Sequence, residues 1–553
     1  MAPDDGGADR FPRLTPSQLA RLRAASEPAE IAPDTALFLA GDVDYDFILV
    51  DEGQVDIELA SPLGGANQVI ASIGEGNFVG ELNMLTGQAA YLSARMPKGG
   101  RVHRMRRDRF LRLMADDAEL SDIVLRAFMA RREFLRQGDA ARAVEIVGAA
   151  HSADTLKLRN WASRLELPHA WIDAETPDGT ELLDAVGVSV ADLPVVVTPT
   201  GVLPRATPGI LAEHLNLSYR AGGRTTVDLV VVGGGPGGLA AALYGASEGL
   251  DTVLVEGVAV GGQAAPSSRI ENYLGFPSGL SGADLTTRAL VQAQKFGARV
   301  SSPCESVALT TGDGELVVAL HDGTRIATHA VVVASGARYR TLPLARWGDF
   351  EDNGIYYAAT ELEARACAAS EDEVVVVGGA NSAGQAAVFL AGKGSRVRLV
   401  VRGDDLTAGM SSYLVERIDA HPRITVQLRT EVVGVDGEDG LDRVVLADRG
   451  AGTETEVPCA GLFCFIGAVP ATAWLDGLHL DRSGFVVTDT ALPRSATHRA
   501  YGLLGRAPLP FETSMPGVFA AGDVRAGSVK RVAAAVGEGS SAVRSVHQAI
   551  GGA

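Results

Sequence analysis

The alternation of apolar and polar positions near the start of the chain predicts a unit built mainly of strands. In residues 1–140, segments such as YDFILVDEGQVDIELA alternate as half-buried strands do, and Asp51-Glu52-Gly53 is expected to form a turn between two of them. The later run DRFLRLMADDAELSDIVLRAFMARREFLRQ repeats apolar residues every three or four positions, as amphipathic helices do. We therefore expect residues 1–140 to form a β-roll closed by helices.

Residues 141–222 show a different pattern, which predicts a small α/β domain. AVEIVGAA is expected to form a strand, DTLKLRNWASRL a helix, and HAWIDAE and LPVVVT two further strands. The glycine-containing polar segment SYRAGGRTT follows and is expected to be a linker.

From residue 225 the pattern is that of long α/β domains. Two apolar strands, VDLVVVGGG and EVVVVGGA, each run directly into glycines and then into a helical pattern, with 145 residues between the two glycine segments. Their similarity predicts two Rossmann-like, three-layer dinucleotide-binding domains. The expected fold class is therefore multidomain: a β-roll with helices, a small α/β domain, and two dinucleotide-binding domains.

Composition and charge narrow the function classes. A chain of 553 residues, 46% of them apolar, is too long for one core, and a net charge of −19 argues against nucleic acid or an anionic membrane as a partner. No apolar run reaches about 18 residues, and the acidic start MAPDDGGADR is unlike a signal peptide. The four cysteines contain no Cys-x-x-Cys pair, which suits a reducing cytoplasm. Cys459 and Cys464 either approach each other or are buried bystanders.

The first glycine segment has the form G-x-G-x-x-G at the end of a predicted strand and the start of a predicted helix. Such glycines permit a tight turn and let backbone N–H groups approach a pyrophosphate at the helix N-terminus. The next predicted strand, TVLVE, ends in Glu256, where a carboxylate can accept hydrogen bonds from the ribose hydroxyls of an adenosine. The simpler alternative is a structural turn. The expected binding residues in this segment are Gly233, Gly235, Pro236, Gly237 and Gly238.

Two further segments, GGQAAPSSRIENYLGFP and GVFAAGDVRAGSVKRVAAAVGEGSSA, carry a family resemblance. They are similar to the flavin-binding segments of thioredoxin reductases and their low-molecular-weight relatives, over residues 225–545. The resemblance implies an FAD-binding domain in residues 223–343 and 465–553 and an NAD(P)H-binding domain in residues 344–464. It also implies a homodimer. The residues that it places at FAD are Gly262, Gln263, Asn272, Asp523, Lys530, Arg531 and Val532.

Some of these residues have a physical role of their own. A helix that opens at Lys530, Arg531 and Val532 would direct its positive end at the flavin and stabilise negative charge on it. Asp523 has the plainer alternative of a helix N-cap.

The second glycine segment resembles an NADP-type site. It has Ala380 where a middle glycine is usual, and an alanine is tolerated there if its φ angle is negative. The following strand, RVRLVVR, ends at Arg402, whose guanidinium suits a 2′-phosphate. A glycine follows where the family commonly has a second arginine, so NADPH is expected and NADH is possible. The expected binding residues are Gly378, Ala380, Asn381, Ser382, Ala383 and Arg402.

The segment GIYYAATE departs from the family at its redox centre. Thioredoxin reductases carry there the dithiol that passes electrons from flavin to a protein disulfide, and the matching positions hold Ala358 and Glu361. Thiol–disulfide exchange needs one thiolate to attack and a second thiol to resolve the adduct. Glu361 is either a proton donor near the flavin or a solvated helix residue. No side chain is therefore expected to replace the flavin as the catalytic group.

The N-terminal unit resembles a cyclic-nucleotide-binding domain through FILVDEGQVDIELA and NFVGELNMLTGQAAYLSA. Gly80 and Glu81 match the family's turn that contacts a ribose hydroxyl. Ala90 stands where an arginine neutralises the cyclic phosphate, so cyclic AMP or GMP binding is doubtful. A degenerate regulatory or dimer-forming domain and a site for another small ligand are the alternatives.

Residues 141–222 resemble thioredoxin or glutaredoxin folds through DLPVVVT, which would make Pro194 cis. No cysteine occurs in this range, and His151 and Ser152 stand near the expected redox position. A structural module and a substrate-docking module are both open.

The resemblances together imply an FAD-dependent NAD(P)H oxidoreductase. Electrons would pass from NADPH through FAD to an acceptor other than a dithiol, such as oxygen, a quinone, a ferredoxin-like protein or a disulfide on a partner. The alternatives are a flavin or nucleotide redox sensor with little turnover and a scaffold that only binds partners. In the family the NADPH domain rotates about two connecting segments, which are expected at SGARYRTLP and FCFIGAVP.

Overall fold

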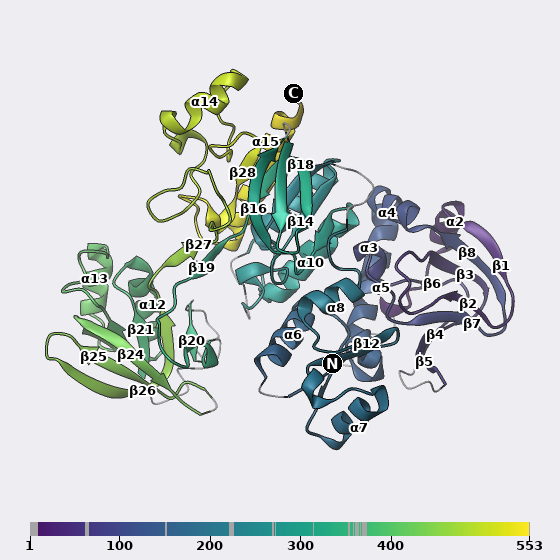
Figure 1. The fold of residues 1–553 in the computed structure, drawn as a ribbon, viewed down its shortest axis with the longest axis horizontal. Helices are drawn as coiled ribbons and strands as arrows, with labels where there is room; N and C mark the ends of the chain where they lie inside the picture. The colour runs from purple at the N-terminus through teal and green to yellow at the C-terminus, as the bar shows by residue number, and fades with distance from the viewer. Residues whose placement is uncertain are drawn as a thin grey trace. The chain divides into compact units, whose positions relative to one another are not determined.

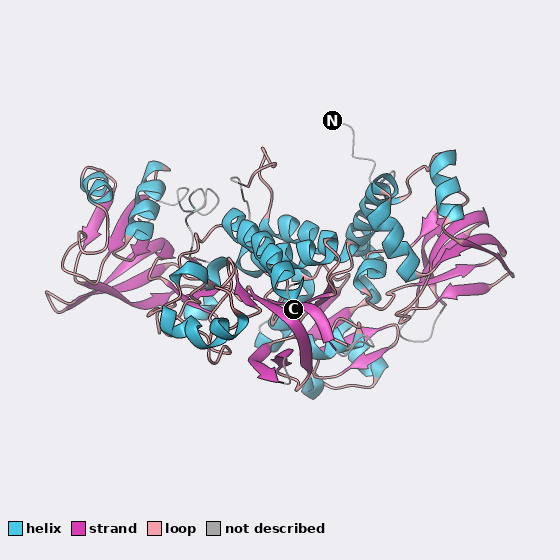
Figure 2. Cartoon of the chain, turned by 90° about the horizontal axis from the view of Figure 1, so that it is seen from above, coloured by secondary structure: helices cyan, strands magenta, loops and turns pink. Residues whose placement is uncertain are grey.

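The chain folds into two compact units, residues 337–470 and the remainder (Figures 1 and 2). Each unit contains one of the two glycine segments. The computed structural model describes residues 9–60, 66–149, 152–220, 226–267, 270, 273–312, 315–351, 354–357, 359, 364, 367, 373–438 and 440–551.

The larger unit begins with the β-roll, formed by two four-stranded sheets that are antiparallel throughout. One sheet has the order β1 (Glu27–Ile31), β8 (Gly100–Met105), β3 (Phe47–Gly53), β6 (Phe78–Val79). The other has the order β2 (Thr35–Phe38), β7 (Ser93–Met96), β4 (Val55–Leu59), β5 (Gln68–Ile73). The helices are α2 (Pro16–Ala24), α3 (Asn83–Thr86), α4 (Arg107–Asp116) and α5 (Ala118–Leu135).

The predicted turn at Asp51-Glu52-Gly53 is wrong. These residues belong to β3, which pairs with β8 as far as Gly53 and Gly100. Strand β4 begins at Val55 and pairs with β5 and β7 in the other sheet, so the chain passes from sheet to sheet at Gln54. The expected β-roll closed by helices is confirmed.

Residues 145–214 form a four-stranded sheet with helices. Strand β10 is parallel to β9, and β11 is antiparallel to β9 and to β12. The four predicted elements are confirmed, and the Leu193–Pro194 peptide bond is cis as expected. The elements are β9 (Glu145–Gly148), α6 (Ala153–Arg164), β10 (Ala170–Asp173), α7 (Pro177–Val186), β11 (Val195–Thr198), β12 (Gly201–Leu203) and α8 (Pro208–His214).

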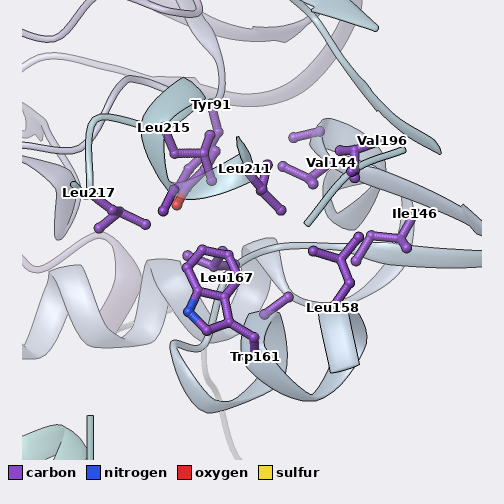
Figure 3. Packing of buried hydrophobic residues seen from close by; sticks show 14 of the residues in the cluster. Tyr91, Val144, Ile146, Leu158, Trp161, Leu167, Val196, Leu211, Leu215 and Leu217 are labelled. Carbon is purple, nitrogen blue, oxygen red and sulfur yellow. The ribbon is translucent and has the colours of Figure 1, made fainter. Parts of the chain in front are cut away.

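This sheet shares a core with the β-roll (Figure 3). Trp161 of α6 is buried with Tyr91 and Leu215 in one cluster. Two polar contacts join the same parts: the Asn216 side chain donates to the Gly87 carbonyl at 2.7 Å, and the Ala89 N–H donates to the Leu215 carbonyl at 3.1 Å.

The first dinucleotide fold is a seven-stranded sheet in the order β15-β14-β13-β18-β17-β16, with β28 beside β18. Both predicted strands and the predicted helix after the glycines are confirmed. Strands β13, β14, β15, β18 and β28 are parallel. The elements are β13 (Thr226–Val232), α9 (Pro236–Ser247), β14 (Thr252–Val255), α10 (Gly282–Lys295), β15 (Arg299–Ser301), β16 (Ser306–Gly312), β17 (Glu315–Leu320), β18 (Arg325–Val333), β28 (Val518–Ala520) and α15 (Val532–Gly551).

Alternate residues of β13 face two different cores, as expected for a sheet covered on both faces. Leu229 and Val231 pack with residues of α9, α10 and α15. Val230 packs on the other face, in a cluster with Leu475 and Val486. The result is the expected three-layer arrangement.

The smaller unit repeats this plan in a sheet of order β23-β22-β21-β26-β25-β24, with β20 beside β26. Its elements are β20 (Ile355–Tyr356), β21 (Glu373–Val377), α12 (Asn381–Gly392), β22 (Arg396–Val400), α13 (Ser412–Asp419), β23 (Ile424–Gln427), β24 (Thr430–Asp436), β25 (Arg443–Asp448) and β26 (Thr453–Cys464). Strands β19 (Ala337–Tyr339) and β27 (Ala468–Pro470) pair with each other at its ends. The division between the units falls at 336/337, inside the expected connecting segment SGARYRTLP, and at 470/471, directly after the expected segment FCFIGAVP.

Among the described residues, none of the helices has the length and apolar character needed to cross a bilayer.

Candidate functional site

The first glycine segment forms a tight loop between β13 and α9. Gly233 has φ +109°, and a Cβ atom there would lie 2.3 Å from the Ala334 carbonyl oxygen. A Cβ at Gly238 would lie 1.8 Å from the Gly233 carbonyl oxygen, so only glycine lets the helix start this close to the strand. Gly235 is the N-cap of α9 and Pro236 its first residue, which leaves the free N–H groups of the first turn at the loop.

Glu256 follows β14 and holds this loop in place. Its carboxylate accepts from the Gly234 N–H at 2.6 Å and from the Val258 N–H at 2.9 Å. The position after β14 is the one predicted for the ribose-binding acid.

Two backbone segments face each other at the loop. A Cβ at Gly262 would lie 2.9 Å from the Gly235 Cα, whereas a Cβ at Gly235 would meet nothing closer than the Gly262 Cα, at 3.9 Å. The Gly261 N–H also donates to the Gly234 carbonyl at 2.8 Å. Gln263 is exposed beside them, and Asn272 lies outside the described residues.

Asp523 lies in a short 3-10 turn after β28, Gly522–Val524. Burial raises the pKa of its carboxyl group, and nearby Lys530 opposes this rise. None of the hydrogen bonds within the described residues uses the carboxylate, since Lys530 donates to the Asp523 backbone carbonyl instead, at 3.2 Å. Helix α15 begins at Val532, so Lys530 and Arg531 precede it rather than form its first turn.

These features fit an FAD-type dinucleotide. The two facing glycines leave a cradle bounded by backbone, which a side chain at Gly235 would fill. A half-buried carboxylate with no protein partner in the described chain, as at Asp523, suits a ligand hydroxyl group, because a desolvated carboxylate is stabilised by a donor. The 20-residue helix α15 has its N-terminus close to Asp523 in sequence.

The second glycine segment has the same construction in the smaller unit. Gly378 has φ +142°, and a Cβ there would lie 2.4 Å from the Phe465 carbonyl oxygen. Ala380 is the N-cap of α12 with φ −110°, a negative value at which an alanine is tolerated. Asn381 accepts from the Ser411 N–H at 2.8 Å. Ser382 and Arg402 are exposed, whereas Ala383 is buried under the loop.

The four cysteines lack the exposure that thiol–disulfide exchange needs. All four are buried, and none forms a disulfide. Cys459 and Cys464 are five residues apart in the same strand, β26, or roughly 16 Å at about 3.3 Å per residue. They therefore do not approach each other as a disulfide requires. Burial raises the pKa of Cys464 to about 11. Ala358 and Glu361 lie outside the described residues.

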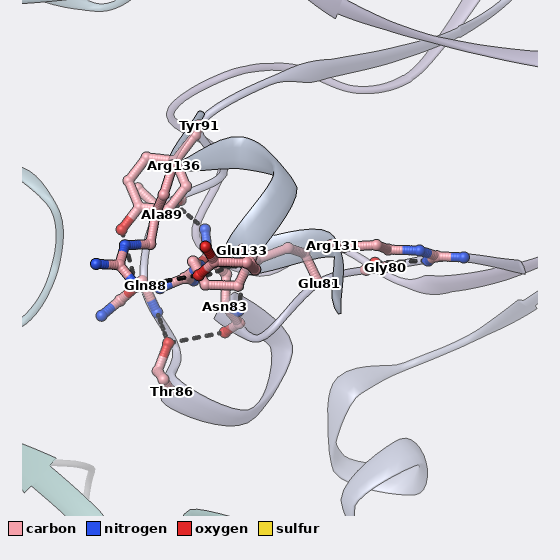
Figure 4. Close-up of polar contacts among 11 residues, drawn as sticks. Gly80, Glu81, Asn83, Thr86, Gln88, Ala89, Tyr91, Arg131, Glu133 and Arg136 are labelled. Atoms are coloured by element: carbon pink, nitrogen blue, oxygen red, sulfur yellow. Dashed lines mark hydrogen bonds and ion pairs between the residues drawn. The ribbon is translucent and has the colours of Figure 1, made fainter. Parts of the chain in front are cut away.

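The β-roll carries the expected Gly80–Glu81 turn, but its carboxylate is already bound (Figure 4). Glu81 is hydrogen-bonded to both Nε and Nη2 of Arg132 from α5, the second at 2.8 Å, and accepts from the Asn83 N–H at 3.0 Å. The Arg132 side chain is 4% exposed and also donates to the Asn83 amide oxygen at 2.6 Å. Ala90 is buried nearby, with no charge to offer a phosphate.

Residues 227–539, which hold both glycine segments, match the family described as pyridine nucleotide-disulphide oxidoreductases. The chain belongs to this family. A second match covers residues 28–117, the β-roll, and is to the cyclic nucleotide-binding domain.

Curated relatives of this oxidoreductase agree with the family. A thioredoxin reductase of Treponema pallidum is 33% identical over 319 residues, covering 57% of this chain and 94% of the relative. A 34.2 kDa protein in the rubredoxin operon of Clostridium pasteurianum is 30% identical over 327 residues, covering 59% of this chain and 98% of the relative. NADPH-dependent thioredoxin reductase 3 of Arabidopsis thaliana is 32% identical over 330 residues, covering 58% of each chain. The thioredoxin-reductase-like class uses FAD and NADPH.

Sequence patterns missed two ion pairs that support the C-terminal part of the oxidoreductase. Glu538 of α15 binds Arg525 at 2.6 Å and accepts from the Gly522 N–H at 2.7 Å, so it fixes the turn that carries Asp523. Glu512 is fully buried and binds Arg506 at 2.6 Å. A buried glutamate in a loop leaves no periodic signal in the sequence. Only the short separation between GDVR, which ends in Arg525, and GEGSS, which contains Glu538, could have suggested the Arg525–Glu538 pair.

Proposed function

We propose that this chain passes electrons from NADPH through FAD to an acceptor other than a dithiol of its own. The observation that carries the proposal is the state of the cysteines. The sequence has no Cys-x-x-Cys pair, and its four thiols are all buried. A thiol must be exposed and ionised to exchange with a disulfide.

When bound, NADPH supplies a hydride and FAD relays its electrons to the acceptor. The glycine loops at Gly235 and Ala380 would hold the two pyrophosphates with backbone N–H groups. Glu256 and Asp523 would accept hydrogen bonds from sugar-type hydroxyls of FAD. Arg402, exposed after β22, would contact the 2′-phosphate that distinguishes NADPH from NADH.

The first experiment measures NADPH oxidation by purified, flavin-loaded protein with a panel of acceptors: oxygen, a soluble quinone, ferricyanide, a ferredoxin and thioredoxin. We expect turnover with at least one non-thiol acceptor and none with thioredoxin. Reduction of thioredoxin at a rate comparable to that of the best other acceptor would refute the proposal.

Variants at the positions assigned to the missing dithiol sharpen the test. The double variant Ala358→Cys with Glu361→Cys restores an attacking and a resolving thiol, and we expect it to gain reduction of a small aromatic disulfide. The matched control, Ala358→Cys alone, can form an adduct but has no second thiol to resolve it. Equal activity of the parent and the double variant would mean that the parent uses another thiol route.

A sensor with little turnover is a second candidate, because the β-roll is packed against the flavin-binding fold. Val291 of α10 belongs to the buried core of the β-roll. The same helix carries Thr286, whose Oγ1 would lie 2.9 Å from a Cβ at Gly261 in the glycine cradle. A protein that bleaches with NADPH and reoxidises with every acceptor no faster than free flavin would favour the sensor.

A further inference from the structure

The β-roll encloses a hollow that none of the roles above uses. Its empty volume is about 680 Å³, a figure that includes space open to solvent. The residues around it come from β2, β4, β5, β6, α3 and α5, from the Gly80–Glu81 turn, and from the segments that hold Phe11, Tyr45 and residues 90–92.

The lining is almost wholly apolar. Phe38, Ile57, Ile73, Val79 and Leu92 are among the side chains that line it, with Ala90 at the position where a phosphate-binding arginine is expected. An anionic phosphate moved into such a surface would lose its hydration without a charged partner, which is strongly unfavourable.

The charged groups at the wall are already bound. Glu81 and Arg132 neutralise each other. Arg131 gives its guanidinium N–H groups to three backbone carbonyls: that of Gly80 at 2.8 Å (Figure 4), and those of Arg10 and Phe78 at 2.9 Å each. Arg10 lies over the ring of Phe134 at 4.4 Å, at the hydrophobic wall of the hollow.

Tyr45 is an uncharged polar residue at the wall of the hollow. Tyr45 lines the hollow and is 8% exposed, yet none of the hydrogen bonds within the described residues involves its hydroxyl. Burial, and then the charge of Glu81, raises the pKa of this phenol, so the group stays protonated and able to donate. A hydroxyl at the wall of the hollow can donate to a ligand oxygen there, and that contact would add one neutral hydrogen bond to binding.

We propose that this hollow binds an uncharged, mainly apolar small molecule with one hydrogen-bond acceptor, which Tyr45 contacts, and that it does not bind a cyclic nucleotide. The domain then keeps the fold of a nucleotide sensor but reads a different class of compound. The proposal does not depend on which acceptor the reductase uses.

The experiment uses the full-length protein and the uncharged fluorescent probe N-phenyl-1-naphthylamine. Three competitors of nearly equal shape are titrated against the bound probe: 2-acetonaphthone, which is neutral with an acceptor; 2-ethylnaphthalene, which is neutral without one; and 2-naphthoate, an anion. Cyclic AMP and cyclic GMP complete the set.

We expect 2-acetonaphthone to displace the probe best, with an advantage over 2-ethylnaphthalene of roughly twofold to tenfold, the range of one neutral hydrogen bond. The anion should be weaker than the ketone by at least about tenfold, and the cyclic nucleotides should not compete at millimolar concentration. Stronger competition by 2-naphthoate or by either cyclic nucleotide would overturn the proposal, as would failure of the probe to bind.

Two variants locate the site. Ala71→Trp places a large ring at a half-buried lining position of β5 and should weaken the probe by more than about tenfold. Ala36→Trp is the matched control, because Ala36 is half-buried in the same sheet but is not part of the lining. Equal loss in both variants would refute the assignment. Tyr45→Phe, which keeps the ring, should erase the difference between the ketone and the hydrocarbon, and a persistent difference would exclude Tyr45 as the donor.

Discussion

Alanine at Gly235 and alanine at Gly238 differ in what the added methyl group meets, so the pair separates cofactor binding from folding. At Gly235 the nearest protein atom would be 3.9 Å away, an ordinary van der Waals contact. The backbone there has φ −74° and ψ −179°, which any residue adopts. The protein itself therefore tolerates this alanine, and only a ligand in the cradle meets the methyl group.

At Gly238 the methyl carbon would lie 1.8 Å from the Gly233 carbonyl oxygen, which is 1.2 Å less than the 3.0 Å below which Cβ contacts essentially never fall. Helix α9 must move away from β13 to relieve the clash. Overpacking of this kind costs about 1–3 kcal/mol or more, which lowers a melting temperature by several degrees.

For Gly235→Ala we expect FAD affinity to fall about tenfold to a hundredfold, the equivalent of one or two weakened charge-assisted hydrogen bonds. The FAD-free protein should melt at the parent temperature. For Gly238→Ala we expect both the FAD affinity and the melting temperature of the FAD-free protein to fall. The measurements are the flavin absorbance per protein chain, FAD binding by fluorescence quenching, and thermal melting of the FAD-free protein. Gly537→Ala, in α15 with nothing within 4 Å of the new methyl group, is the neutral control.

Full flavin retention by Gly235→Ala would show that the pyrophosphate is not held at this loop. A parent-like melting temperature for Gly238→Ala would show that the strand–helix contact is not needed for folding. Either result refutes the reasoning behind the candidate site.

Three further predictions follow from other contacts. Glu81→Gln leaves the buried Arg132 without its counter-charge and should destabilise the β-roll by about 3–5 kcal/mol in urea unfolding. Glu119→Gln, in an exposed pair, should lower the stability much less, and equal losses would contradict the burial argument. Arg402→Glu should raise the KM for NADPH at least about tenfold while the KM for NADH changes little; parallel changes would remove Arg402 from the 2′-phosphate site. Burial, opposed by the Leu167 carbonyl, lowers the pKa of His169 below 6.5, so the stabilising contribution of its neutral form is present above that pH and is lost as the pH falls through the folded-state pKa. His169→Asn should therefore flatten the fall in melting temperature between about pH 7.5 and about pH 5.5, and an unchanged profile would refute this.

Local patterns predicted the parts of the fold that depend on local physics. Strands β13 and β21 are continuous apolar runs that end in glycine, and both formed as expected because each is buried on two faces. The cis peptide at Pro194 was expected from the resemblance of DLPVVVT to a thioredoxin-type segment, not from a local pattern.

Contacts between distant residues were not predictable in this way. The β3–β4 region has the apolar run FILV, the polar stretch DEGQ and then the alternating VDIEL, a pattern that predicted a turn within one sheet and not the passage between two sheets at Gln54. Glu81 was expected to face a ribose, but Arg132, 51 residues later, binds it. The division of the chain into domains at the predicted bounds, the binding role of each site residue and the homodimer stay predictions.

The buried cysteines offer a way to watch the molecule open. Cys304 lies in the core of the larger unit, and Cys367, Cys459 and Cys464 lie in the cores of the smaller one. A thiol reagent reaches a buried sulfur only when its surroundings open, so the rate of labelling measures that opening. Cys304→Ser would leave labels in the smaller unit alone. One chain thus contains separate natural reporters for the opening of each unit, which could show which unit a ligand stabilises.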